Sequence, residues 1–188
     1  MKKYIWLFAL LALAPLSPAF AGDSHETWEP YKGSAEFERL KSLAGEWQGT
    51  SKTGEESDPL VAEYVVSSGG TIVIERLFAH TPHEMVSIYE EDGGKVVMTH
   101  YCMLRNKPKM SLTSADNNTM RFDLTTGNDF DASKDRHMHS LIVAFEGDDE
   151  IQQQWTCFNE GKNEHTTVVD LKRVPPTGPS SALTTPQV

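Results

Sequence analysis

From Gly45 to Arg173 the sequence consists of short segments in which apolar and polar residues alternate, and this pattern constrains the fold more than any other feature. A period of two is typical of a β-strand, because successive side chains point to opposite faces of the sheet. Val, Ile, Thr and aromatic residues dominate these segments, and turn-forming residues separate them. We expect ten strands, at residues 45–53, 60–67, 71–79, 83–90, 95–103, 108–114, 118–126, 137–146, 150–158 and 164–173.

The turns between the segments favour antiparallel pairing of neighbours along the chain. Asp92-Gly93 is a strong two-residue hairpin signal, and residues 147–149 and 160–163 mark two more hairpins. The longest irregular stretch, 127–136, has no helix that could serve as a parallel crossover. The predicted fold class is therefore all-β, a ten-stranded antiparallel up-and-down β-barrel that leaves no exposed sheet edge. A two-layer sandwich is the alternative.

One short helix is expected ahead of the first strand. Ser34 is a suitable N-cap, because its side-chain oxygen can accept a hydrogen bond from a free N–H of the first turn. Phe37, Leu40 and Leu43 then recur at helical spacing with charged residues between them, and Gly45 ends the pattern. The barrel is thus expected to begin directly after an amphipathic N-terminal helix.

The ends of the chain differ in composition from the barrel. Residues 1–21 have a charged start, an apolar stretch and a final Ala-x-Ala, which is the pattern of a secretory signal peptide. Residues 22–33 form an irregular lead-in, 34–174 the barrel, and 175–188 a Pro/Ser/Thr-rich tail that we expect to be disordered. Since the apolar stretch is too short to span a bilayer, we expect a periplasmic or secreted protein without stable membrane insertion.

The charge balance excludes one class of partner. The chain has a formal net charge of −10 and no cluster of Lys and Arg, which disfavours nucleic acid and anionic membranes. Gly-rich phosphate loops, Gly-x-Ser-x-Gly and His-Glu-x-x-His are absent from the sequence, so catalysis is not the favoured interpretation. The sequence does not define an oligomeric state.

Two hairpin registers indicate which side chains face the interior. If Glu91 pairs with Gly94, Met85 lies opposite His100. Thioethers and thiols are common in protein interiors, so we expect the face with Met85, Met98, His100 and Cys102 to point inward. In the later hairpins, a second, mainly apolar face pairs Leu141 with Trp155, His139 with Cys157 and Cys157 with His165.

His137-Met138-His139 is the sharpest chemical feature. Two histidines at i and i+2 on a strand share a face and can chelate one metal ion, and His100 could supply a third ligand. Such a set suits zinc, copper or iron, or the iron of heme. The alternative is a structural pair with ordinary hydrogen bonds, which the missing carboxylate partner favours.

The two cysteines and one glutamate leave alternatives open. Cys102 and Cys157 lie on strands that are not neighbours in the expected barrel, so we expect two thiols, although a flattened barrel could allow a disulfide. Glu75 is either a buried acid or a solvated surface carboxylate.

Gly45-Glu46-Trp47 opens the first strand after the helix, and Arg173 ends the last strand. This arrangement resembles the lipocalin-like (calycin) proteins, in which a basic residue of the last strand stacks on the Trp of a Gly-x-Trp motif and closes one end of the barrel. The strand count is also similar to that of fatty-acid-binding and nitrobindin-like heme-binding barrels. The resemblance implies a central cavity for one small ligand.

The favoured function is therefore an exported protein that binds a small apolar or amphipathic ligand in the barrel. The alternatives are a metal- or heme-binding barrel using His100, His137 and His139, and a structural or accessory protein without a ligand. The residues expected at the ligand are Trp47, Met85, Met98, His100, Cys102, His139, Leu141, Trp155, Cys157 and His165.

Overall fold

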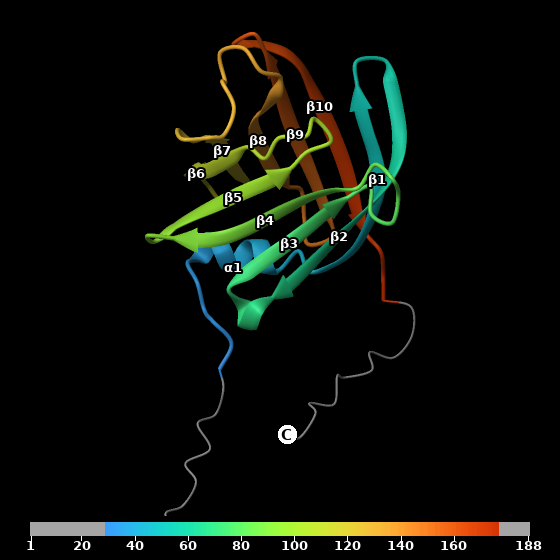
Figure 1. Ribbon diagram of the computed structural model, residues 1–188. Coiled ribbons are helices and arrows are strands. Elements are labelled where there is room, and N and C mark those ends of the chain that lie inside the picture. Colours follow the sequence, from blue (N-terminus) through green and yellow to red (C-terminus); the bar gives the residue numbers. More distant parts are fainter. Residues whose placement is uncertain (1–28, 177–188) are drawn as a thin grey trace, which may run out of the picture.

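The alternating segments pair in chain order, and the last strand returns to the first to close a barrel. In the computed structural model, which describes residues 29–176, the order is β1-β10-β9-β8-β7-β6-β5-β4-β3-β2, all antiparallel (Figure 1). The ten-stranded all-β fold is thus confirmed. The expected signal peptide and nearly all of the tail lie outside the described residues. The strands are β1 (Gly45–Thr53), β2 (Glu56–Ser67), β3 (Ile72–Leu77), β4 (Met85–Asp92), β5 (Lys95–Tyr101), β6 (Lys109–Ala115), β7 (Thr119–Leu124), β8 (His137–Phe145), β9 (Glu150–Asn159) and β10 (Lys162–Arg173).

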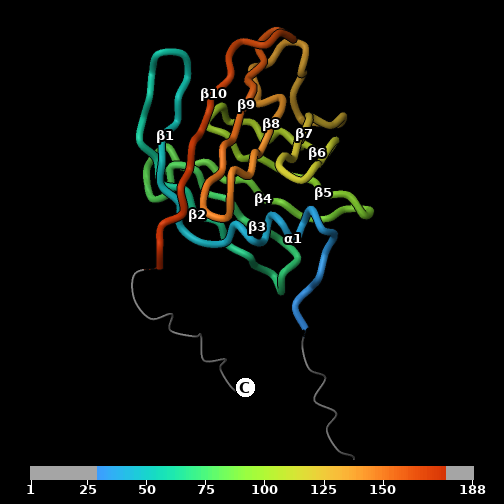
Figure 2. The backbone as a smooth tube through the Cα atoms, turned by 180° about the vertical axis from the view of Figure 1, so that it is seen from behind, coloured from blue at the N-terminus to red at the C-terminus, as the bar shows by residue number. Residues whose placement is uncertain are grey.

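The N-terminal helix α1 (Ala35–Lys41) closes one end of the barrel. The Ser34 side chain accepts a hydrogen bond from the Phe37 backbone N–H, as the N-cap prediction required. Phe37 and Leu40 are fully buried, and Glu38 and Arg39 between them are half-buried. The helix lies across one end of the strands (Figure 2). A single 3-10 turn, η1 (Ser68–Gly70), links β2 and β3 at the same end. None of the helices within residues 29–176 has the length and apolarity needed to cross a membrane.

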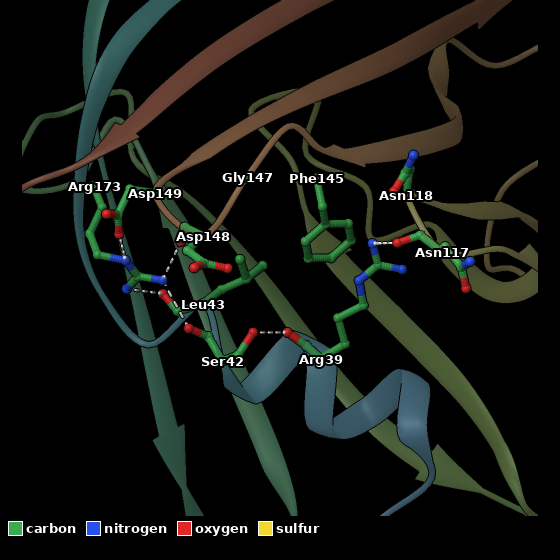
Figure 3. Close-up of a pocket in the computed structure, with 10 residues that line it drawn as sticks. All are labelled: Arg39, Ser42, Leu43, Asn117, Asn118, Phe145, Gly147, Asp148, Asp149 and Arg173. Atoms are coloured by element: carbon green, nitrogen blue, oxygen red, sulfur yellow. Dashed lines mark hydrogen bonds and ion pairs between the residues drawn. The ribbon is translucent and has the colours of Figure 1, made fainter.

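The predicted Trp–Arg closure of the barrel end is confirmed. The Trp47 indole is fully buried and donates to the Leu43 carbonyl at 2.8 Å, and the Arg173 guanidinium lies 4.3 Å above its ring. Arg173 also donates to the carbonyl of Ser42, the first residue after α1 (Figure 3), and to the carbonyl of Ala44. One side chain of β10 therefore satisfies backbone groups at the helix C-terminus and packs on the indole.

The β4–β5 hairpin corrects one predicted register. Asp92 pairs with Lys95 and Ser87 with His100, so the pairing of Glu91 with Gly94 and of Met85 with His100 is wrong. The two-residue turn consists of Gly93 and Gly94, both with positive φ, a conformation that glycine adopts without strain. The shift is two residues, so each side chain keeps its face, and Met98 and His100 are buried as expected.

The later hairpins follow the prediction up to a β-bulge. Leu141 pairs with Trp155 and Cys157 with His165, as predicted. At the start of β8 the ladder shifts, and Met138 takes the place opposite Cys157 that was expected for His139. The extra residue of a bulge reverses the alternation, so His137 and His139 point to the outer side of the barrel instead of the interior.

Candidate functional site

The barrel interior is filled near α1 and through its middle, and a small cavity remains at the opposite end. The buried core includes large side chains from every strand. The cavity has a volume of about 160 Å³. It lies between the ends of strands from both sides of the barrel and is lined by Ser51, Thr53, Leu77, Phe78, Met85, His100, Met138, Trp155, Thr167 and Val169.

His100 is the polar group on which the chemistry of this cavity depends. Its side chain is 1% exposed, and its Nδ1 lies 3.0 Å from the Ser87 hydroxyl oxygen. Among residues 29–176 its Nε2 has no hydrogen-bond partner. The ring lies against the Trp155 indole, with a centroid separation of 4.5 Å. A buried polar atom without a partner is rare in native proteins and costs stability, so it marks a place where another molecule can bind.

Burial keeps the His100 imidazole neutral. Burial desolvates the ring and lowers the pKa of His100 to about 4, and no carboxylate within residues 29–176 opposes this effect. The Ser87 hydroxyl can turn to donate to Nδ1 or to accept from it. Nε2 can therefore present either an N–H or a lone pair to a bound molecule.

The low pKa of His100 predicts acid sensitivity. In the unfolded chain the imidazole has a pKa of about 6.5, so the unfolded state takes up the proton first as the pH falls. The stabilisation is complete above about pH 6.5 and is lost as the pH falls toward 4, by about 3 kcal/mol over that window. Urea unfolding of the parent and of His100→Gln from pH 7.5 to pH 4 measures it. Equal loss of stability in both proteins would contradict the assignment.

A hydrogen-bonded network continues from the cavity wall into the middle of the barrel. Trp155 donates from Nε1 to the Gln153 side-chain oxygen at 2.8 Å, and the Gln153 amide donates to the Tyr64 hydroxyl oxygen and to Glu75. Glu75 is fully buried and also accepts from the hydroxyls of Tyr64, at 2.6 Å, and Tyr89, at 3.0 Å. Of the two alternatives for Glu75, the buried acid is therefore correct.

The tyrosines of this network stay protonated donors. Burial, and next the Glu75 charge, raise the pKa of Tyr64 and of Tyr89 well above the usual value. The network fixes the position of the Trp155 ring, because its only N–H is committed to Gln153. One wall of the cavity is thereby held by side chains of four strands.

Three of the predicted ligand residues line the cavity, and the other seven do not. Met85, His100 and Trp155 line the cavity. Met98 and Leu141 are buried core residues that do not line it, and Trp47 lies at the α1 end. Cys102 follows the end of β5 and borders a surface hollow instead of the barrel cavity.

His100 and the His137/His139 pair do not form one site in the structure. His137 Nδ1 lies 2.7 Å from the Asp135 carbonyl, and its Nε2 lies 3.1 Å from His139 Nδ1. The His139 ring stacks on Phe158 at 3.8 Å, on the outer side of the barrel. Within residues 29–176, the ring nitrogens of these three histidines do not come close enough together to hold one metal ion as a set of three. Both nitrogens of His137 are thus engaged in hydrogen bonds.

The heme alternative does not fit the cavity beside His100. His100 Nε2 is a suitable iron ligand in its chemistry. A volume of about 160 Å³ is smaller than a pocket for a drug-sized molecule, about 300–1,000 Å³, and does not accommodate a porphyrin. The residues present therefore fit a smaller molecule.

Cys102 and Cys157 are both free thiols in the structure, as the strand order predicted. Burial raises the pKa of each thiol. Cys157 lies close to Glu164 and His165, at the end of the barrel that α1 does not cover.

Several cavity residues were missed at the sequence level. Ser51 and Thr53 share a strand face with Trp47, so alternation along β1 could have identified them. Met138 reaches the cavity only because of the bulge at His139. Phe78 follows β3 with a φ of 54°, a left-handed conformation that strains a bulky residue. The local sequence does not predict this conformation.

A larger hollow of about 590 Å³ lies outside the barrel, between α1 and the β6–β7 and β8–β9 turns (Figure 3). Its two arginines are already engaged. Arg39 donates to the Asp116 and Asn117 carbonyls and covers the Phe145 ring at 3.7 Å, and Arg173 binds the residues after α1 and Asp149. The two arginines that line this hollow therefore attach the helix to the barrel.

Comparison with known proteins supports the fold alone. No protein-family model and no curated protein matches the chain. The fold is similar to the crystal structure of a Nostoc punctiforme protein of unknown function from the DUF3598 family, with a TM-score of 0.50 and 14% sequence identity over 72% of this chain and 49% of that chain. The chain thus spans about half the length of that protein.

Proposed function

We propose that this protein is an exported binding protein for a small, neutral, amphipathic molecule about the size of one ring, held in the barrel cavity with its polar atom on His100. The observation that carries the proposal is the buried His100 Nε2, which has no partner among residues 29–176 and lines the cavity. A ligand with one donor or acceptor would satisfy this atom.

The volume and lining of the cavity define the size and charge of the ligand. An apolar cavity of about 150 Å³ can take up benzene, and the cavity here measures about 160 Å³. Six of its ten lining residues are apolar or aromatic, none carries a full charge when His100 is neutral, and the Thr53 and Thr167 hydroxyls bond to each other. A long-chain lipid is too large, and a charged ligand would lack a counter-charge.

The Trp47–Arg173 closure supports kinship with lipocalin-like barrels. The leader-like residues 1–21 support export to the periplasm or medium. A structural or accessory protein without a ligand is the competing proposal, and it requires His100 Nε2 to have no function.

The test compares two rings that differ in one hydroxyl. We expect phenol to bind more tightly than toluene in calorimetric titration, by about tenfold, because only phenol can bond to His100. His100→Leu should abolish this preference while keeping toluene binding. His83→Leu, an exposed histidine outside the cavity, is the matched control and should behave as the parent.

Binding of neither ring at millimolar concentration, or an unchanged preference in His100→Leu, would overturn the proposal. Native mass spectrometry of protein purified from its own host is a second, independent test of the proposal. We expect a co-purifying species of one-ring size that is absent from the Leu77→Trp variant, in which the indole fills the cavity.

A further inference from the structure

Three metal-ligating side chains converge on the β9–β10 hairpin, apart from the cavity histidine. Cys157 Sγ lies 3.7 Å from Glu164 Oε2, and Glu164 Oε2 lies 3.3 Å from His165 Nδ1. All three ligand atoms lie within 4.8 Å of one another. Neither the fold nor the proposed ligand binding requires this arrangement.

The hairpin geometry produces the cluster. Cys157 and His165 are direct cross-strand partners, so their side chains leave the same face of the ladder. The register shifts between Asn163 and His165, which makes Glu164 the additional residue of a bulge and turns its carboxylate toward the other two groups. The thiol is buried, whereas the Glu164 and His165 side chains are 33% and 27% exposed, so an ion could enter from the solvent side.

The separations match those of a tetrahedral metal site. With bonds of about 2.3 Å to sulfur, 2.05 Å to imidazole nitrogen and 2.1 Å to carboxylate oxygen, tetrahedral geometry puts S and O about 3.6 Å apart and N and O about 3.4 Å apart. The measured 3.7 Å and 3.3 Å are close to these values. A thiol, an imidazole and a carboxylate form a donor set that suits zinc and related transition metals better than magnesium or calcium.

Arg136 is the competitor for this site. Its Nε donates to Glu164 Oε2 at 2.6 Å, and this is the same oxygen that lies beside Cys157 and His165. A cysteine thiol ordinarily carries its proton at neutral pH, and the thiolate is the form that binds a metal. Binding of M²⁺ therefore forms an S–M bond and releases one proton to solvent, so affinity should increase with pH.

We propose that Cys157, Glu164 and His165 form a three-ligand site for a divalent transition metal such as zinc, with water as the fourth ligand and Arg136 as a built-in competitor for the carboxylate. The site is distinct from the trio of His100, His137 and His139. It is also independent of the proposed ring-binding cavity, so either proposal can fail alone.

The test is titration of the purified protein with Co²⁺, followed by displacement with Zn²⁺. We expect an equimolar complex with the near-ultraviolet thiolate-to-cobalt charge-transfer band, which Zn²⁺ removes. Cys157→Ser should abolish the band, and His165→Ala and Glu164→Gln should weaken binding, the former by about 100-fold. Arg136→Gln should strengthen it by about tenfold, because a positive charge beside the ion is removed.

Matched variants make the result specific. Cys102→Ser removes the other thiol, His139→Ala breaks the histidine pair, and His100→Leu removes the cavity histidine, and all three should keep the band and the affinity. A cobalt complex without the band, a band that survives Cys157→Ser, or an Arg136→Gln variant that binds cobalt more weakly would overturn the site. Circular dichroism of each variant shows whether a lost band reflects unfolding. If Cys157→Ser unfolds, the cobalt affinity of Glu164→Gln, which should keep its fold and bind more weakly than the parent, decides.

Discussion

Replacing Glu75 with Ala is expected to lower the free energy of unfolding by about 5 kcal/mol. The carboxylate is fully buried and accepts hydrogen bonds from Tyr64, Tyr89 and Gln153. Its removal leaves these donors short of an acceptor in the middle of the barrel, at a cost of about 1–3 kcal/mol each, and also opens a cavity. Urea unfolding at pH 7 followed by tyrosine and tryptophan fluorescence measures the loss.

Two controls separate this effect from a general loss of charge. Glu75→Gln keeps the size and one carbonyl oxygen, so it should cost about 2 kcal/mol or less. Glu63→Ala removes a partly exposed carboxylate paired with Arg76 on the neighbouring strand and should cost less than about 1 kcal/mol. If Glu75→Ala were as mild as Glu63→Ala, the network would not stabilise the barrel.

The network also divides the barrel interior into two parts. Toward α1 lies an apolar core around Trp47, Phe37 and Leu40. Beyond the network, on the side away from α1, lie His100 and the cavity. Because Trp155 belongs to both the network and the cavity wall, loss of Glu75 should also loosen the proposed binding site.

The strand order could be predicted because its signals are local. Alternation in each segment and turn residues between the segments determine an up-and-down barrel, and the turn at residues 147–149 gives the β8–β9 register directly. The β4–β5 register was wrong by two residues because three consecutive residues, Asp92, Gly93 and Gly94, each suit a tight turn. The bulge at His139 had no local signal, because Phe130 and Phe158, which pack around the His137/His139 pair, come from distant segments.

The candidate site was only partly predictable, because contacts across the barrel interior and bulges leave no local signal in the sequence. His100 and Trp155 were identified because each lies on a strand whose interior face could be inferred from its neighbours. The contact between their rings joins β5 to β9 across the barrel, and strand pairing does not specify contacts across the interior. The convergence of Glu164 with Cys157 likewise depends on a bulge in β10.

Gly49→Ala is the second large effect, and we expect a loss of about 4 kcal/mol in the free energy of unfolding. A Cβ at Gly49 would lie 1.7 Å from the Asp170 carbonyl oxygen and 2.8 Å from its carbon, far inside van der Waals contact. Backbone cannot rotate away as a side chain can, so β1 and β10 must separate. Separation breaks ladder hydrogen bonds beside the Gly49–Leu171 pair, each worth about 1 kcal/mol, and loosens the buried Leu171 side chain.

Gly54→Ala is the matched control, because it adds the same methyl group in the β1–β2 turn. A Cβ there meets nothing within 4 Å, but the φ of +59° strains an L-residue, so we expect a cost of only about 1 kcal/mol. Thermal and urea unfolding compare the two variants. If Gly49→Ala is too unstable for a full transition, amide hydrogen exchange in β1 and β10 should show the loss of protection there first. Equal stability of the two variants would mean that the strands adjust to the added methyl. The close approach of the Asp170 backbone would then not explain why residue 49 is a glycine.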